Sequence, residues 1–500
     1  MLQKGLIGGT CSMLSAVNGN ILRRILVLLT VSTLSGCALM QPADSYRTTG
    51  RQVPATTEHP AGLPSAKQLE GPLNPPQATE TDRGKSLRDK LEMEAGSEDG
   101  VVTLEQAISL ALAHNPELKV SSWEVRALEG RVFQAGRLPN PEIAAETEDF
   151  GGSGDLAGFD AAETTVQVSE LVELGGKRSK RKRLSALERD VAGLDHMIKR
   201  ADVLAEVTLA FVDVLSAQEH QSLMEGLLHL AEEAFSSTAE RVKAGKVSPV
   251  EEIKARVALS EAKIDLKRAD NELKVARMKL SATWGRTTST FQKVQGDLDS
   301  VLPIPPLEEL ERLISQNPDI ARWAAAIDQQ RAGVELEKAK GIPDFTVSLG
   351  MKYHHESNDK AFIVGVSIPF PIFDRNQGGV LEARSRLSKA REESIVARLK
   401  AINTLGEKYQ VLSSAFTEAT ALHSDVLPGA QAAFEASREG YRQGKFAYLD
   451  MLDAQRTLIA VKVRYINALT TYHKSATEVE RLIGKKIKEL INVQEKEKRL

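Results

Sequence analysis

Cysteine is almost missing from this chain. Only Cys11 and Cys37 occur among the 500 residues, and both lie in the first 40. The rest of the sequence therefore offers no disulfide and no thiolate metal site. Aromatic residues are also few, at 5%, whereas 27% of the residues are charged. This balance is typical of extended helices and not of a thick aromatic core.

The sequence also lacks a charge excess of one sign. Its formal net charge is −3, and the basic run from Lys177 to Arg183 is too short to indicate nucleic-acid binding. The nine histidines are scattered apart from the pair His354–His355, and no phosphate-cradling loop is present. We therefore predict that the chain is no enzyme, holds no cofactor or resident metal, and depends on a partner protein for any energy that its activity requires.

The N-terminal apolar segment is too short to cross a bilayer. Ile25–Leu34 follows two arginines and falls below the roughly 18 residues of a spanning helix, which is typical of an export signal. The next residues, Leu34-Ser-Gly-Cys37, resemble a bacterial lipobox. This predicts a lipoprotein-type signal over residues 1–36 and a lipid anchor at Cys37, with Ala38 implying the outer membrane. An ordinary signal with a chance cysteine is the alternative, and Met13 is a second possible start.

Residues 37–100 are predicted to form an extended tether, since 41–76 are rich in Pro, Thr, Ser and Gly and show no apolar period. Beyond the tether, the sequence repeats itself. Four short motifs recur in the same order at offsets of 202, 204, 198 and 199 residues. The pairs begin at Asn115 and Asn317, Gly136 and Lys340, Val166 and Val364, and Ala244 and Gln443. We predict two tandem repeats, 101–300 and 301–485, followed by a charged tail over 486–500.

Each repeat is predicted to contain a helix, a pair of strands, a very long helix, a Gly-Lys turn and a second long helix. Strands are expected at about 142–172 and 344–371, where apolar and polar residues alternate. In the second repeat aromatic residues stand at both ends of the two apolar rows, Phe345 to Tyr353 and Phe362 to Phe370. Eight residues tilted by about 40° climb roughly 20 Å, close to the apolar band of an outer-membrane barrel. A hairpin half-buried on a soluble core is the alternative.

Long helices are predicted because no proline interrupts the chain between Ser179 and Gly245, where apolar residues step by three and four as in a coiled coil. Some 60 helical residues would reach about 90 Å. The chain reverses near Gly245 and Gly444, so each repeat supplies one antiparallel helical hairpin. The fold class is mixed α and membrane β.

The strand count predicts an oligomer. Four strands per chain can neither close a barrel nor leave their edges unpaired in lipid. Two chains would give eight strands and a filled interior, whereas three would give twelve and an open bore. A cyclic homotrimer with a 12-stranded barrel in outer-membrane lipid and a ring of helical hairpins beneath it is the expected assembly.

The segment from Tyr441 to Gln455, YRQGKFAYLDMLDAQ, resembles a hairpin tip of the TolC-like outer-membrane efflux factor family. In the family, paired aspartates in this segment ring the periplasmic mouth of the tunnel. Here these are Asp450 and Asp453, which the i, i+3 spacing places on one helix face. Two solvated surface charges are the alternative.

The resemblance also implies a latch and a docking surface. Glu251 matches the acidic residue that contacts the tyrosine of the second hairpin in the closed state, here Tyr441. Phe446 stands where the best-studied member has an arginine, so a second charged latch is in doubt. The turns Gly245-Lys246 and Gly444-Lys445 match the tips on which the family docks a periplasmic adaptor, with turn chemistry alone as the alternative.

A second motif, Glu173-Leu-Gly-Gly-Lys-Arg178, resembles the cobalt, zinc and cadmium branch of the family. It implies heavy-metal cargo, an adaptor and an inner-membrane RND-type pump as partners, and an outer-membrane site with a long periplasmic extension. The glycine pair permits a sharp bend, and the basic residues could face lipid head groups. A duct for drugs or other organic solutes is the alternative within the family; a periplasmic adaptor or coiled-coil scaffold is the alternative outside it.

Overall fold

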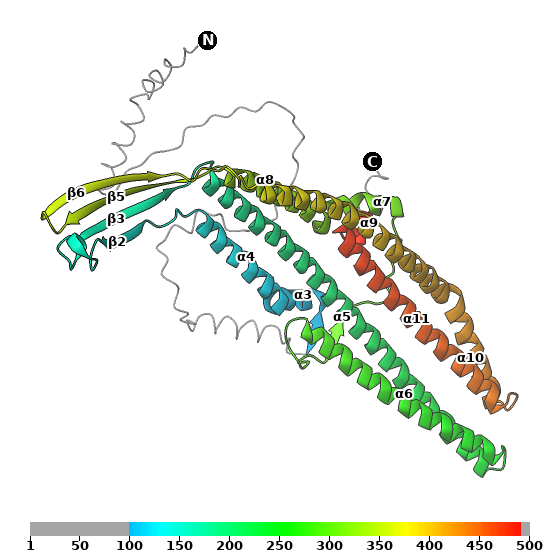
Figure 1. The fold of residues 1–500 in the computed structure, drawn as a ribbon. Helices are drawn as coiled ribbons and strands as arrows, with labels where there is room; N and C mark the ends of the chain where they lie inside the picture. The colour runs from blue at the N-terminus through cyan, green and yellow to red at the C-terminus, as the bar shows by residue number, and fades with distance from the viewer. Residues whose placement is uncertain (1–99, 492–500) are drawn as a thin grey trace, which may run out of the picture. The chain divides into compact units, whose positions relative to one another are not determined.

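The computed structural model describes residues 100–491 (Figure 1). The predicted signal over 1–36, the lipid anchor Cys37, nearly all of the tether and the end of the predicted tail lie outside the described residues. Within the described part, the chain consists mainly of long helices, with one four-stranded sheet at one end of them (Figure 1).

The two halves of the described chain have nearly the same order of elements. The first contains β1 (Val101–Thr103), α3 (Leu104–His114), α4 (Pro116–Ala135), β2 (Glu142–Glu148), η2 (Gly154–Leu156), β3 (Glu163–Val172), α5 (Lys177–Lys243) and α6 (Pro249–Ala282). The second contains β4 (Lys293–Gln295), α7 (Leu307–Leu313), η3 (Ile314–Gln316), α8 (Pro318–Lys340), β5 (Phe345–His354), β6 (Asp359–Ser367), α9 (Gln377–Ala421), η4 (Leu422–Val426), α10 (Leu427–Arg442) and α11 (Tyr448–Ile483).

Two buried asparagines begin α4 and α8 in the same way. Asn115 and Asn317 each precede a proline at the first helical position, and each Oδ1 accepts a 2.8 Å hydrogen bond from the N–H two residues on. Their Nδ2 groups donate to the carbonyls of Thr283 and Leu482, at 2.7 and 2.6 Å. Each asparagine therefore ties a helix start to the far end of its own half.

The sheet has the order β2-β3-β5-β6, and all neighbouring strands are antiparallel. Its central pair joins the two halves of the chain, with Val168 opposite Leu349 and Val166 opposite Met351. The register places apolar side chains on one face and polar ones on the other, because successive residues of a strand point to opposite sides. The strands end earlier than the predicted limit of 371, since β6 stops at Ser367 and Phe370 lies beyond it.

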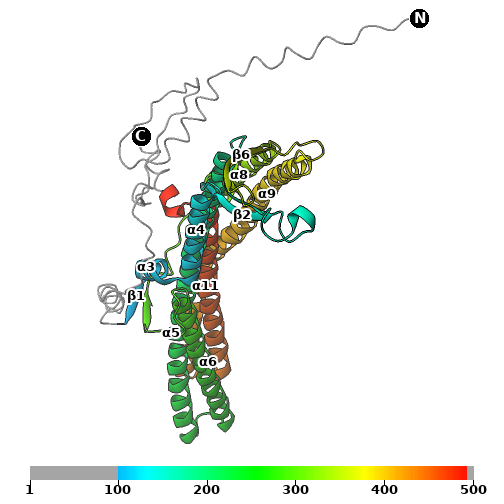
Figure 2. The ribbon, with the colours of Figure 1, turned by 60° about the vertical axis from the view of Figure 1, so that its left-hand side comes forward.

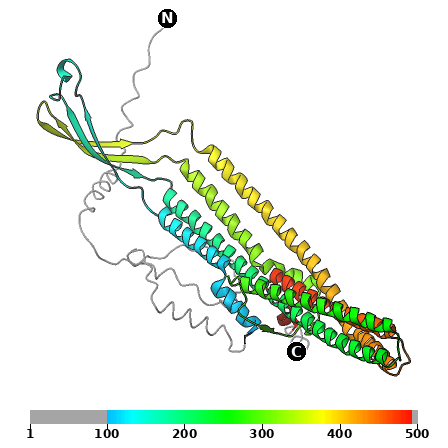
Figure 3. The ribbon, with the colours of Figure 1, turned by 90° about the horizontal axis from the view of Figure 1, so that it is seen from below.

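The helices form two antiparallel hairpins that extend away from the sheet (Figures 1 and 3). Helix α5 runs for 67 residues without interruption, which corresponds to about 100 Å, and α6 returns beside it. The second hairpin, α10 and α11, lies beside the first, as a view from another side also shows (Figure 2).

The second hairpin differs from the first in its ascending helix. A π-helical turn, η4, separates α9 from α10 just before Pro428. Proline cannot donate the backbone hydrogen bond that a continuous α-helix requires, and a π-turn absorbs the mismatch. Pro428 is the sequence signal for this break, but one continuous helix was predicted through it.

Three clusters of buried apolar residues hold the helices together, and two of them join both halves of the chain. Near the C-terminal end of α11, Arg481 bridges Asp202 of α5 and Asp319 of α8 at 2.6 and 2.8 Å. Ile487 and Leu490 are buried in the same region, so the packed chain continues past the tail boundary predicted at 485. Within residues 100–491, no helix is both long and apolar enough to cross a membrane.

Candidate functional site: the paired hairpin tips and the strand–helix junction

The two hairpin tips use the same backbone turn. At the first, the N–H of Lys246 donates to Arg241 O and that of Gly245 to Val242 O, both at 2.9 Å. At the second, Lys445 donates to Gly440 O at 2.8 Å and Gly444 to Tyr441 O at 3.0 Å. This pair of bonds is the Schellman motif, which needs a left-handed residue, and Gly245 and Gly444 have φ of +68° and +72°. Both predicted tips, Gly245-Lys246 and Gly444-Lys445, are exposed.

The two predicted gate aspartates lie on one side of the second hairpin. Asp450 and Asp453 are exposed and line an open hollow of about 500 Å³ between α10 and α11, together with Ser437 and Thr457. The carboxylate of Asp450 accepts a 3.0 Å hydrogen bond from the N–H of Ala447 and so caps α11. Asp453 has no ion pair within the described chain. Its charge is therefore free to act on whatever enters the hollow.

Tyr441 points the other way, into the contact between the two hairpins. It is 4% exposed and packs with Ala255, Tyr448 and Met451. Its hydroxyl lies 3.1 Å from Thr238 Oγ1 on α5, and its ring meets Tyr448 edge-on at 5.8 Å between centroids. Sequence reasoning singled out Tyr441 but missed Thr238, which carries no local signal in the sequence.

Arg241 is a second residue that sequence reasoning missed. Its Nη1 donates to Tyr441 O at 3.2 Å, and its guanidinium carbon lies 4.5 Å from the centroid of the Tyr441 ring. A guanidinium over an aromatic face contributes about 0.5–1 kcal/mol at exposed sites. The available signal was an arginine four residues before the tip glycine.

Glu251 does not bond Tyr441 in this structure. Its Oε2 is buried and has no hydrogen-bond partner among the described residues. Burial raises the pKa of the Tyr448 phenol, and the nearby Tyr441 and the Glu251 carboxylate act in the same direction. The predicted bond between Glu251 and Tyr441 stays a prediction for another state of the tips.

The sequence profile of the family described as "Outer membrane efflux protein" matches residues 107–286 and 310–485. The chain belongs to this family. It is 37% identical over 406 residues to the cobalt-zinc-cadmium resistance protein CzcC of Cupriavidus metallidurans, covering 81% of this chain and 95% of the relative. It is 25% identical over 300 residues to the nickel-cobalt-cadmium resistance protein NccC of Alcaligenes xylosoxydans xylosoxydans, covering 60% and 67% of the two chains.

Solved structures agree on the fold of this efflux protein. The crystal structure of CusC matches with a TM-score of 0.65 at 17% identity, over 76% of this chain and 92% of that one. VceC of Vibrio cholerae matches with a TM-score of 0.63 at 16% identity, over 77% and 96%. At this identity the likeness shows the fold alone. The recognition of the TolC-like family is confirmed, and the alternative of an adaptor or coiled-coil scaffold is wrong.

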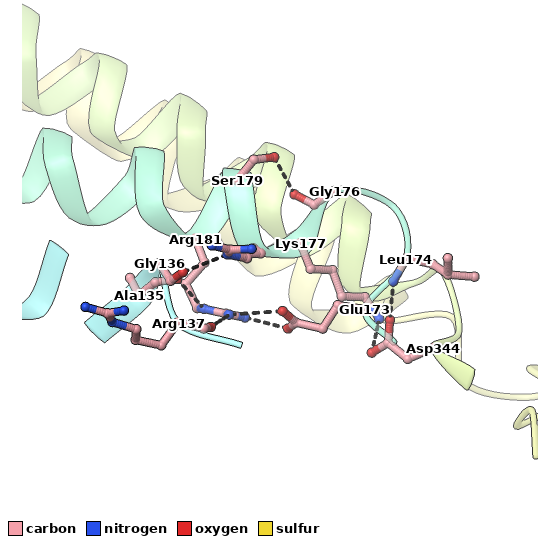
Figure 4. A network of polar contacts seen from close by, with 11 residues as sticks. Ala135, Gly136, Arg137, Glu173, Leu174, Gly176, Lys177, Ser179, Arg181 and Asp344 are labelled. Carbon is pink, nitrogen blue, oxygen red and sulfur yellow. Dashed lines mark hydrogen bonds and ion pairs between the residues drawn. The ribbon is translucent and has the colours of Figure 1, made fainter. Parts of the chain in front are cut away.

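The Glu-Leu-Gly-Gly-Lys-Arg motif of this efflux protein forms the junction between β3 and α5 (Figure 4). Gly175 and Gly176 have φ of +67° and +69°, which provides the predicted bend. A Cβ on Gly175 would lie 2.8 Å from Ile342 Cδ1. Glu173 accepts two hydrogen bonds from Arg181 at 2.7 and 3.1 Å, and Arg181 Nε donates to Ala135 O at 3.1 Å (Figure 4).

The basic residues of this motif turn inward more than the sequence suggested. Lys177 is buried and pairs with Asp344 at 2.8 Å (Figure 4). Arg178 Nε donates to Gly136 O at 2.6 Å. Burial alone would raise the pKa of Asp344, but Lys177 and the N–H of Leu174 outweigh it and lower that pKa. Lys177 and Arg178 therefore stabilise the bend between β3 and α5. The prediction that the basic residues face lipid head groups is wrong for Lys177.

The polar face of the sheet carries a further group of charges. Lys352 pairs with Glu148 at 2.8 Å and with Glu163, and Glu163 Oε1 lies 2.8 Å from His354 Nδ1. His354 is the last residue of β5. Among the described residues, no three or more His, Asp or Glu side chains are placed to hold a metal ion together.

Proposed function

We propose that this efflux protein is the outer-membrane channel subunit of a tripartite system that exports divalent heavy-metal cations. The assignment of heavy-metal cations as cargo rests on the 37% identity to a cobalt-zinc-cadmium resistance protein over 95% of that protein's length. NccC, named for nickel, cobalt and cadmium resistance, supports the same cargo. A periplasmic adaptor and an inner-membrane RND-type pump would supply cargo and energy.

The sheet supports a homotrimer with twelve strands. Strands β2 and β6 each have one partner in the described chain, so each leaves an edge that a second copy can pair. One face presents exposed apolar side chains suited to lipid, among them Ile143, Leu349, Phe362 and Val364. The opposite face carries Glu142, Glu146, Glu148 and Glu163, which would line the bore with negative charge and favour cations.

The tips supply the gate and the docking surface of the proposed channel. Asp450 and Asp453 of three copies would place six carboxylates around the axis, which attracts cations and repels anions. Glu251 and Tyr441 would exchange contacts as the tips open. The turns Gly245-Lys246 and Gly444-Lys445 would receive the adaptor. Cys37 would attach the chain to lipid, and its replacement by serine should abolish lipid labelling if that assignment is correct.

The cargo can be tested in a cell that carries a metal-exporting pump and its adaptor but lacks their outer-membrane channel. Expression of this protein should restore growth in zinc, cobalt or cadmium and lower the periplasmic metal content. A matched culture is challenged with dyes and hydrophobic drugs. Restored tolerance to organic compounds without any change in metal tolerance would contradict the heavy-metal assignment and favour an organic-solute duct.

A further inference from the structure

We infer that Lys182 and Arg183 of α5, here called the basic patch, bind the phosphate groups of anionic phospholipids in the leaflet from which the helices emerge. The inference rests on the proposed outer-membrane channel and adds a lipid preference to it. The patch stands more than one helical turn beyond Lys177, whose side chain turns inward to Asp344. Head-group contact therefore moves from the motif itself to the residues that follow it.

The first argument is the direction of the charges at the junction between β3 and α5. The last residue of β3 and the first residue of β5 pair with each other and continue the apolar row. Glu173 and Asp344 each stand one residue beyond this pair, so alternation directs their carboxylates to the polar side. They pair with Arg181 at 2.7 Å and with Lys177 at 2.8 Å. The Leu174 side chain points away from these ion pairs (Figure 4).

The rotation of the helix then turns the basic patch to the apolar side. Successive residues of an α-helix are rotated by about 100°, so Arg183 lies roughly opposite Arg181, and Lys182 lies about 140° from Lys177. Both patch residues are exposed, and neither forms an ion pair with any residue in 100–491. A Cβ on Gly136 would lie 3.5 Å from Lys182 Cδ, so the aliphatic stem of this lysine lies against the end of α4.

The second argument is the depth of the patch. Lys182 and Arg183 follow the N-cap residue Gly176 by six and seven residues, which corresponds to about 9–11 Å along α5. Helical side chains lean toward the N-terminus of their helix, and the N-terminus of α5 is its sheet end (Figure 1). Long basic side chains can therefore reach back toward the sheet. The interfacial layer extends roughly 5–8 Å beyond the hydrocarbon core, so both charges reach its level.

The third argument is that the fold does not need these cations. Helix α5 begins with KRSKRKR, which places six cations in seven residues and no acidic residue in the first turn. Cations near a helix N-terminus are unfavourable, and of these six only Lys177 and Arg181 form ion pairs in the described chain. The equivalent helix α9 begins with QGGVLEA, whose one charged residue is Glu382. The second junction thus forms without a basic start.

An anionic phospholipid matches both properties of this surface. Its phosphate accepts charge-assisted hydrogen bonds from lysine and arginine, and its acyl chains suit the exposed side chains of Leu174 and Phe370, which are 40% and 85% exposed. A zwitterionic lipid also carries a phosphate, but its cationic group would repel the patch. Glu170 is the one carboxylate at an apolar-face position of the described strands, and the two patch cations outnumber it.

The test measures which lipids the full-length protein retains after extraction from vesicles of phosphatidylglycerol and phosphatidylcholine in equal amounts. Native mass spectrometry gives the ratio of the two retained lipids. The native protein should prefer phosphatidylglycerol, and Lys182→Ala with Arg183→Ala should lower the ratio roughly twentyfold, or about fivefold for each cation. Because both side chains are exposed, this double variant should unfold thermally like the native protein in detergent.

Two further double variants separate charge at this place from charge in general. Lys182→Arg with Arg183→Lys should keep the native ratio, because both positive charges remain. Lys263→Ala with Lys267→Ala is the matched control, since it removes two exposed cations of α6 that form no ion pair in the described chain. An equal fall of the ratio in this control would overturn the basic patch, as would a native ratio in the alanine variant of Lys182 and Arg183.

Inorganic phosphate distinguishes a lipid site from a site for the free anion. Millimolar phosphate should leave the retained phosphatidylglycerol in place, because the acyl chains contribute to binding. Displacement by phosphate would indicate a free-anion site and overturn the lipid assignment. A protein that enters neither lipid would contradict the proposed channel, whereas insertion without any preference for phosphatidylglycerol would contradict the basic patch alone.

Discussion

The two hairpins are built to one plan but are not equivalent. Both turns close with the same two backbone bonds, and both halves begin α4 or α8 with an asparagine cap. The first hairpin has a continuous ascending helix and contributes Arg241 and Thr238. The second has a π-turn and contributes Tyr441, Asp450 and the hollow beside it. The comparison teaches that two copies of one scaffold can carry different side chains at equivalent positions of the same turn.

The acidic pair shows the division most clearly. Six residues after the tip glycine stand Glu251 and Asp450, and nine residues after it stand Lys254 and Asp453. The first hairpin therefore places a cation where the second has its other carboxylate. In the proposed trimer, only the second copy therefore contributes carboxylates at both of these positions.

The largest expected effect is a loss of stability, and it tests the asparagine caps that the two halves share. Asn115→Ala and Asn317→Ala should each lower the free energy of unfolding by about 2–4 kcal/mol, because each removes a helix cap and leaves a buried carbonyl without its donor. Denaturant unfolding of the detergent-solubilised protein measures the loss. Ser122→Ala, at a half-exposed position on α4, is the control. Markedly unequal losses at the two asparagines would break the comparison.

The next largest effect is on cation block, and it tests the acidic pair that the second hairpin has and the first lacks. Replacing Asp450 and Asp453 together by asparagine should raise the concentration of a divalent cation needed to block the pore by roughly tenfold, equivalent to about 1.4 kcal/mol. Glu251→Gln should change the blocking concentration far less, because Glu251 Oε2 is buried and Lys254 stands where the second hairpin has its other carboxylate. Bilayer conductance with added cobalt or zinc measures the block. Equal effects of the two substitutions would show that both hairpins contribute to the cation site.

A smaller effect is expected at the π-turn. Pro428→Ala restores a backbone donor and should allow an ordinary α-helical continuation, with slower hydrogen exchange over residues 422–430, by an amount equivalent to about 1 kcal/mol. His229→Ala is the matched control, since it lies 199 residues earlier in the unbroken helix α5 and should leave exchange there unchanged. Unaltered exchange in Pro428→Ala would mean that the proline is not the cause of the π-turn.

The smallest effect concerns two carboxylates near the strand–helix junctions, one in each case. Asp344 pairs with Lys177, and Glu337 accepts a 2.7 Å hydrogen bond from Asn376 Nδ2. Burial would raise the pKa of Glu337, but Lys340 and Asn376 outweigh it, so both carboxyl pKa values are lowered. Each group therefore stabilises the fold fully above its unfolded pKa, near 4, and loses that contribution as the pH falls through the lower folded value.

Asp344→Asn and Glu337→Gln should each cost about 0.5–1 kcal/mol at pH 7, a range set by the partial exposure of both groups. The deficit relative to the native protein should shrink as the pH falls below about 4. Thermal unfolding from pH 7 to pH 3 provides the measurement. A deficit that persists at pH 3 would attribute the loss to packing and not to charge.

The prediction of the elements was good where local patterns decide them. Coiled-coil spacing placed α5, alternation placed β5, and glycine placed both turns. The prediction of the site was incomplete because its contacts join distant segments. Tyr441 and Thr238 are 203 residues apart, and no local pattern indicates that they meet. The pairing of Lys177 with Asp344 was missed for the same reason. A basic run at the start of a helix is equally typical of a solvent-exposed face and of buried ion pairs with a distant segment.

The sequence by itself determined the family, the long helices, the strands and the two glycine turns, because each depends on spacing or backbone conformation within a few residues. The tertiary structure decided the pairing of β3 with β5, the ion pair between Lys177 and Asp344, and the contact of Tyr441 with Thr238. These depend on which side chains of two rigid helices come within a few ångströms, and that is fixed by the packing of the whole chain. Arg241 illustrates the difference. The sequence shows an arginine near a turn, whereas the fold shows that its side chain donates a hydrogen bond to the Tyr441 carbonyl in the turn of the other hairpin.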